Sequence, residues 1–326
     1  MTAAALAWHA NAASGAPIKL SLTGYGEVDN LILEALRKQE RLIVLDLSPQ
    51  FQATVDEIDR TFPEEGTPFL FDHHQSMYEK FSNRRWLVAD MNCCGAAVYW
   101  NWLTAGNAAP DVLRRIQPLR DMVWLANDRD LWINENPNGR LWQAMVTLCG
   151  EWGALTRLIT NPDASFTEAE REAVVRFVAD QEARFARARE HIVRRQIGDG
   201  TVGEIAFLGD GHLDFGDTSD FCGALLDRPD AKEKAPALVA LAYRRPGGNW
   251  AVSLRSRNGL AGRAVALLKD GRKVRGGGHG DAAALYFPTQ YREADIRESI
   301  LAALATHGEN SSATGVTLGD LLKGVL

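Results

Sequence analysis

The segment from residue 18 to residue 90 alternates short apolar runs with stretches of helical spacing. The stretch 28–38 carries apolar residues at intervals that form one buried helix face. The apolar runs are nearly continuous in Val, Ile, Leu and Phe, as in strands that are covered on both faces. This alternation predicts stacked βα units around a mainly parallel sheet, hence an α/β fold. We expect the strands at 18–23, 41–47, 68–72 and 86–89.

The length of 326 residues exceeds what one hydrophobic core usually supports, so two domains are expected. Residues 94–131 are expected to be helical. Thr167 and Glu170 form a capping-box pattern at the start of a long helix that we expect to reach about residue 196. Strand patterns resume at 202–208, 237–243 and 250–255 and predict a smaller α+β domain. The expected boundaries are 1–150 for the first domain, 151–198 for a helical connector, 199–310 for the second domain and 311–326 for a tail.

Composition and net charge indicate which classes of protein this sequence can belong to. Hydrophobic residues make up 46% and charged residues 24%, which is typical of a soluble globular protein. The net charge of -6 argues against a protein that holds long duplex DNA electrostatically, but leaves a short or small phosphorylated ligand open. The four cysteines match neither a zinc-ligand pattern nor a disulfide framework. No apolar run is long enough to cross a membrane and the start lacks a signal-peptide pattern, so we expect a cytoplasmic location.

Acidic and imidazole side chains follow two of the expected strands. Asp72, His73 and His74 come directly after one apolar run, and Asp46 ends another. Parallel strands deliver such residues to the carboxyl edge of the sheet, where open α/β sheets bind their ligands. Divalent metals such as Mn²⁺ accept carboxylate oxygen together with imidazole nitrogen. Asp46 alone could equally cap a helix after its strand.

A glycine-rich motif lies much later in the chain. Gly276, Gly277 and Gly278 precede His279, and the alanines that follow are expected to begin a helix. Glycines let backbone N–H groups approach an anion, and a helix N-terminus would favour the same anion. A flexible turn would explain the glycines as well. Arg255 and Ser256 end an earlier expected strand, where the arginine could bind a phosphate with two hydrogen bonds.

Together these motifs resemble the DHH phosphoesterase superfamily with a DHHA1 domain. The resemblance rests on Asp46 in Leu-Asp-Leu-Ser, on Asp72-His73-His74, on the acidic cluster 128–130, and on Ser-Leu-Arg-Ser followed by Gly-Gly-Gly-His. It spans residues 1–290. The superfamily includes exonucleases that degrade short RNA, cyclic-dinucleotide phosphodiesterases, RecJ-like nucleases and polyphosphatases. The resemblance implies a Rossmann-like DHH domain, a connecting helix and a DHHA1 domain.

The resemblance also implies roles for individual residues. Asp46 would bridge two metal ions, His73 would bind one of them, and one aspartate of the helical cluster would complete the coordination of the second metal ion, with Asp128 favoured over Asp130. Asp72 would hold the local geometry or act as a further ligand, and His74 would face the scissile phosphate. The residues that would hold the other end of the substrate, across a cleft between the domains, are Arg255, Ser256, Gly276, Gly277, Gly278 and His279.

One superfamily motif does not occur in this sequence. Members usually begin with a strand ending in His-x-Asp-x-Asp-Gly, whereas residues 1–7 here resemble the helix that follows it. His9 is expected to be an ordinary helix-surface residue. The complete family site holds two Mn²⁺ or Mg²⁺ ions, and this chain is expected to hold one or none. We expect a chain truncated at its N-terminus from an enzyme lineage rather than an evolved pseudoenzyme.

The leading functional hypothesis is a metal-dependent phosphoesterase that acts on short single-stranded oligonucleotides or small nucleotides. One alternative is a non-catalytic module that binds a nucleotide or phosphate, because the first metal motif is absent. A second alternative is an exopolyphosphatase. No membrane partner is expected, and a homodimer stays open.

Overall fold

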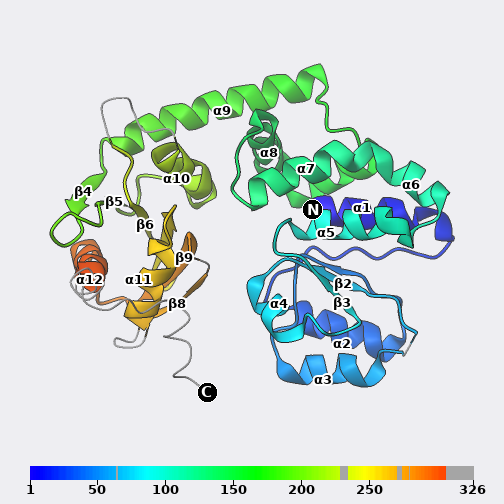
Figure 1. The fold of residues 1–326 in the computed structure, drawn as a ribbon. Helices are drawn as coiled ribbons and strands as arrows, with labels where there is room; N and C mark the ends of the chain where they lie inside the picture. The colour runs from blue at the N-terminus through cyan, green and yellow to red at the C-terminus, as the bar shows by residue number, and fades with distance from the viewer. Residues whose placement is uncertain (64, 228–233, 270–273, 279, 306–326) are drawn as a thin grey trace. The chain divides into compact units, whose positions relative to one another are not determined.

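The computed structural model describes residues 1–326 except 64, 228–233, 270–273, 279 and 306–326 (Figure 1). The chain divides into two compact units, Met1–Val178 and Ala179–Leu326. The division falls inside the connector that the sequence predicts. Across the described residues, every helix is too short or too polar to cross a bilayer. The predicted C-terminal tail, 311–326, lies outside the described residues.

The first unit is built on a parallel sheet of order β1-β2-β3. Its strands are β1 (Val44–Leu45), β2 (Leu70–Asp72) and β3 (Leu87–Ala89). Its helices are α1 (Thr2–Asn11), α2 (Val28–Lys38), α3 (Gln52–Thr61), α4 (Gln75–Phe81), α5 (Gly95–Trp102), α6 (Pro110–Ile116), α7 (Arg120–Asp130) and α8 (Pro137–Thr160), with short helical turns η1 (Ala12–Ser14), η2 (Leu103–Asn107) and η3 (Gln117–Leu119).

The central strand β2 is buried on both faces, and its side chains alternate between two cores. Leu70 packs with Ile32 of α2 and Ile58 of α3, whereas Phe71 packs with residues of α1, α5 and α7. Figure 1 shows α2 and α3 on one side of this sheet and α1 and α5 on the other. The parallel α/β prediction is therefore confirmed, and the polar residues after β2 are held by a strand fixed from both sides.

Two details of the first unit differ from the prediction. Residues 18–23 run as irregular chain rather than as a strand, because they join no strand ladder; Leu20 and Leu22 are partly buried against the neighbouring core. His9 is not a simple surface residue, because its ring is partly buried and its Nε2 atom lies 3.0 Å from the carbonyl oxygen of Leu158.

Helix α9 (Glu168–Arg189) begins in the first unit and ends in the second. The predicted capping box is present, since the Thr167 amide donates to Glu170 Oε2 at 2.8 Å and the Glu170 amide donates to Thr167 Oγ1 at 3.2 Å. The helix is shorter than predicted. Its expected last turn, Val193–Gln196, forms strand β4, in which Val193 pairs with Phe207.

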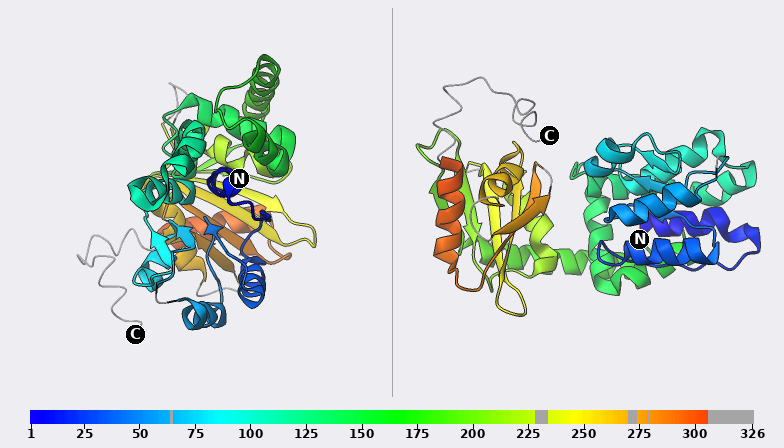
Figure 2. Two further views of the ribbon diagram at one scale, coloured as in Figure 1. Left: turned by 90° about the vertical axis from the view of Figure 1, so that its right-hand side faces the viewer. Right: turned by 90° about the horizontal axis from the view of Figure 1, so that it is seen from below.

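The second unit contains a mixed sheet of order β4-β5-β6-β7-β9-β8. Alternate residues of its central strands face a core formed with α11 and α12, and α10 covers the other face. Figure 2 shows α12 lying along this sheet. The α+β prediction is confirmed. The elements after β4 are β5 (Glu204–Leu208), η4 (Phe215–Asp217), α10 (Thr218–Leu226), β6 (Leu238–Arg244), β7 (Trp250–Ser256), α11 (Leu260–Lys269), β8 (Arg275–Gly278), β9 (Ala282–Phe287) and α12 (Glu293–Ala305).

Candidate metal centre and phosphate-binding residues

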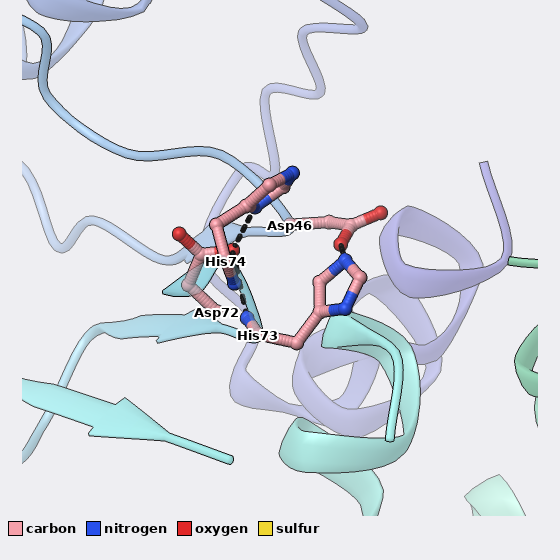
Figure 3. Close-up of side chains that lie close together, drawn as sticks. All are labelled: Asp46, Asp72, His73 and His74. Atoms are coloured by element: carbon pink, nitrogen blue, oxygen red, sulfur yellow. Dashed lines mark hydrogen bonds and ion pairs between the residues drawn. The ribbon is translucent and has the colours of Figure 1, made fainter. Parts of the chain in front are cut away.

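Four side chains of the predicted metal motif meet at the carboxyl edge of the parallel sheet (Figure 3). Asp46 follows β1, Asp72 ends β2, and His73 and His74 come next. One donor atom from each lies within 4.8 Å of the others. The meeting follows from topology, because neighbouring parallel strands end at one edge.

His73 lies between two carboxylates. Its Nε2 atom is 3.1 Å from Asp46 Oδ1 and 3.1 Å from Asp130 Oδ2 at the end of α7. Ligands on adjacent corners of an octahedral ion, with bonds of about 2.1 Å, lie about 3 Å apart. One imidazole nitrogen and two carboxylate oxygens are also a donor set that Mn²⁺ accepts. The two distances from His73 Nε2 are therefore compatible with ligands of one divalent cation.

The backbone at Asp46 turns sharply to aim its carboxylate at His73. Its φ of 63° lies in the left-handed region, which aspartate tolerates better than most residues. The Asp46 amide donates to the carbonyl of Phe71 at 2.9 Å, which ties the turn to β2. Gly95, the first residue of α5, donates its amide to Asp46 Oδ1 at 3.3 Å. A Cβ at Gly95 would lie 2.7 Å from that oxygen, so a side chain there would displace the carboxylate.

Asp72 is fully buried and holds the two histidines in place. Its Oδ1 atom accepts the His73 amide at 2.8 Å and lies 2.6 Å from His74 Nδ1. Its Oδ2 atom is buried without a hydrogen-bond partner in the described part of the chain, and Figure 3 shows it pointing away from Asp46. Of the two roles expected for Asp72, this arrangement favours holding the geometry over binding the ion.

The charges around His73 favour its protonated form when no metal is bound. Burial lowers the pKa of His73, but its hydrogen bond to Asp46 and the charges of Asp130, Asp46 and Asp72 outweigh burial and raise it. Burial opposes ionisation of Asp46, yet the hydrogen bond and charge of His73 hold the pKa of Asp46 below its usual value. Burial and the Asp46 charge raise the pKa of Asp130. These charges therefore favour a proton on His73, in competition with a cation between the two carboxylates.

The two aspartates at the end of α7, Asp128 and Asp130, make different contacts. Asp130 contacts His73, whereas the buried Asp128 accepts the amides of Glu135 at 2.9 Å and Asn136 at 3.3 Å. Asp128 therefore stabilises the loop that leads into α8. The structure brings Asp130, and not the favoured Asp128, to His73.

In the second unit the predicted phosphate-binding residues are already engaged. Arg255 donates from Nη1 to Ser253 Oγ at 3.1 Å and to the Leu254 carbonyl at 2.9 Å. Ser256 is fully buried; its hydroxyl donates to Asp281 Oδ1 at 2.7 Å and accepts the Ala261 amide at 3.1 Å. Ser256 thus fixes the turn into α11, and Arg255 stays a predicted phosphate ligand.

The glycine motif forms a strand rather than a loop before a helix. Gly276 to Gly278 belong to β8, at the edge of the sheet, and the alanines that were expected to begin a helix form β9. Residues 282–287 favour strand β9 over a helix, because every second side chain, Ala283, Leu285 and Phe287, points into the core. A Cβ at Gly276 would lie 2.8 Å from the Ala284 carbonyl oxygen, whereas Gly277 has open space beside it. His279 lies outside the described residues.

Sequence reasoning missed two residues at the metal edge. Gly95 follows Cys94 at the start of α5, and its close approach to Asp46 depends on a contact that spans 49 residues. Tyr25 lies in an irregular segment, and its hydroxyl oxygen is 3.0 Å from His74 Nε2. Only the Gly-Tyr-Gly sequence at 24–26 marked a turn there.

Comparison with known proteins agrees with this architecture. RecJ from Thermus thermophilus in complex with Mn²⁺ has a TM-score of 0.56 at 16% identity over 94% of this chain, which spans 50% of that RecJ. Residues 205–306 match the DHHA1 domain family. Residues 205–306 therefore form a DHHA1 domain, and the chain shares the fold of RecJ. No curated protein matches the chain in sequence.

Two further solved structures resemble the chain with lower TM-scores. An exonuclease RecJ bound to manganese has a TM-score of 0.49 at 16% identity, over 96% of this chain and 89% of that one. The pGpG-specific phosphodiesterase PggH of Vibrio cholerae has a TM-score of 0.49 at 10% identity, over 94% of this chain and 95% of PggH.

Proposed function

We propose that this DHH/DHHA1 chain is a metal-dependent phosphoesterase that hydrolyses phosphodiester bonds of short oligonucleotides or small nucleotides. The observation that carries the proposal is the convergence of Asp46 and Asp130 on His73 Nε2. A divalent cation bound there, Mn²⁺ or Mg²⁺, would polarise a phosphoryl oxygen and lower the pKa of a bound water. The RecJ comparison supports the choice of metal, since that protein was crystallised with Mn²⁺.

The remaining residues of the edge orient the histidines. Asp72 anchors His74 through Nδ1, so that the opposite nitrogen of the ring points away from Asp72 (Figure 3). The hydrogen bond to Asp72 raises the pKa of His74, which favours the protonated ring that can stabilise a phosphoryl oxygen. Gly95 holds Asp46 in the orientation that reaches His73. The site can therefore bind an ion and neutralise charge on a phosphate beside it.

The substrate class follows from charge. The net charge of -6 disfavours long nucleic acid, whose binding depends on an extensive basic surface. Arg255 of the DHHA1 domain remains the proposed ligand for a non-reacting phosphate, where a guanidinium can form two parallel hydrogen bonds. A small nucleotide or a short oligonucleotide needs no such extensive surface.

The test is a hydrolysis screen of the purified chain with Mn²⁺. The substrates are dinucleotides, cyclic dinucleotides, 3′-phosphoadenosine 5′-phosphate and polyphosphate. His73→Ala should lower turnover by at least about 100-fold, because it removes the central ligand. His212→Ala is the matched control, since His212 is an exposed histidine of the second unit. Turnover of polyphosphate alone would favour an exopolyphosphatase. Nucleotide binding without turnover would favour a binding module.

A further inference from the structure

Tyr25 belongs to neither predicted motif, yet it contacts the histidine expected to face the phosphate. Its hydroxyl oxygen lies 3.0 Å from His74 Nε2, and its ring meets the His74 ring edge-on at a centroid distance of 5.8 Å. Because Asp72 Oδ1 lies 2.6 Å from His74 Nδ1, both ring nitrogens of His74 have a partner. The imidazole is therefore held at both ends.

The direction of these hydrogen bonds follows from the chemistry of the groups. An ionised carboxylate only accepts hydrogen bonds, so His74 Nδ1 carries the proton that faces Asp72. A tyrosine hydroxyl can both donate and accept, so Tyr25 donates to Nε2 of the neutral ring and accepts from the Nε2–H of the protonated ring. Burial raises the pKa of Tyr25 to about 12, so the phenol keeps its proton near neutral pH.

Tyr25 has a further hydrogen-bonding partner besides His74. Its phenolic oxygen has a hydrogen bond with the buried Ser48, whose Oγ atom accepts from Gln50 Nε2 at 3.3 Å. The turn that carries Tyr25 is closed by the Glu27 amide, which donates to the Gly24 carbonyl at 3.2 Å. The chain of contacts therefore runs from Ser48 through Tyr25 and His74 to Asp72.

We propose that Tyr25 is a positioning residue for His74: its hydroxyl, with the Asp72 carboxylate opposite, fixes the orientation of the imidazole that acts on the phosphoryl group. The inference rests on the proposed function, since it concerns the same site. A ring held only by Asp72 can swing about that one hydrogen bond, and a misplaced donor stabilises a transition state poorly. Tyr25 acts through His74 and need not touch the substrate.

The experiment compares Tyr25→Phe with Tyr78→Phe in the full chain. Tyr25→Phe removes one hydroxyl and keeps the ring, and Tyr78 is a similarly exposed tyrosine on α4. The expected result for Tyr25→Phe is a kcat lowered about 5-fold to 10-fold, as for loss of one hydrogen bond, with KM and Mn²⁺ affinity unchanged. Tyr78→Phe should change none of them. An unchanged kcat for Tyr25→Phe, or a raised KM at constant kcat, overturns the proposal.

A second readout does not depend on activity. Side-chain ¹⁵N spectra of the metal-free chain report the protonation and the hydrogen bonding of His74 Nε2. Tyr25→Phe should shift the His74 Nε2 resonance and leave the His9 resonances unchanged; unchanged His74 resonances overturn the proposal. If the wild-type chain hydrolyses none of the tested phosphoesters, the proposed function fails, while the spectra still decide whether Tyr25 holds His74.

Discussion

The two predicted binding regions of this chain differ in how their residues are used. At the edge of the first sheet, Asp46, His73 and Asp130 converge on one point although 84 residues separate the first from the last. In the second unit, Ser256 is committed to a turn and the glycine motif to a strand. Strand ends in a parallel sheet determine where side chains meet, whereas a glycine run leaves the backbone conformation open.

The largest expected effect separates the two aspartates of α7. Asp130→Asn should weaken Mn²⁺ binding by about 100-fold and leave the free energy of unfolding nearly unchanged, because the charge that faces His73 is lost. Asp128→Asn should leave Mn²⁺ binding nearly unchanged. It should lower the free energy of unfolding by about 1–2 kcal/mol, because it weakens two hydrogen bonds from backbone amides.

Calorimetric Mn²⁺ titration and urea unfolding of both variants check this prediction. If Asp128→Asn lost metal binding and Asp130→Asn did not, the metal centre would have to be reassigned. If neither variant changed Mn²⁺ binding, the cluster of Asp46, His73 and Asp130 would not be a metal site.

The second effect is a dependence of metal binding on pH. The pKa of His73 is raised by its carboxylate neighbours, so below that raised pKa the ring is protonated and cannot bind a metal. The Mn²⁺ affinity should therefore be full above this pKa, and should fall about tenfold per pH unit as the pH drops below it. The raised pKa of Asp130 acts in the same direction at lower pH.

Titrations between pH 5.5 and pH 8 in buffers of different ionisation enthalpy would measure the affinity and the proton released. An affinity that does not change across this range would mean that His73 is not a ligand. The His212→Ala variant should show the same pH dependence as the wild-type chain.

The smallest effect tests the glycine strand of the second unit. Gly276→Ala should destabilise the chain by about 1–3 kcal/mol, since its Cβ would meet the Ala284 carbonyl oxygen and two core side chains. Gly277→Ala should stay within about 0.5 kcal/mol, because the space beside it is open. Urea unfolding of both variants checks the contrast. Equal costs would contradict the strand placement of β8.

The sequence predicted the elements and strand ends that local patterns determine. It missed the residues whose position depends on contacts with distant parts of the chain. The parallel sheet, helix 28–38 and the capping box of α9 follow from local periodicity and spacing. Periodicity could not distinguish Asp128 from Asp130, because both lie in the last turn of the same helix. Only the contact with the loop at Glu135 shows which carboxylate is already engaged. Tyr25 lies in a segment without periodicity, and its contact with His74 spans 49 residues.

The measurement that tests the metal centre most directly is anomalous diffraction at the manganese edge, on crystals of the whole chain grown with excess Mn²⁺. The expected result is a peak within bonding distance of His73 Nε2, Asp46 Oδ1 and Asp130 Oδ2. Crystals that show Mn²⁺ only elsewhere, or no peak beside His73, would contradict the metal centre.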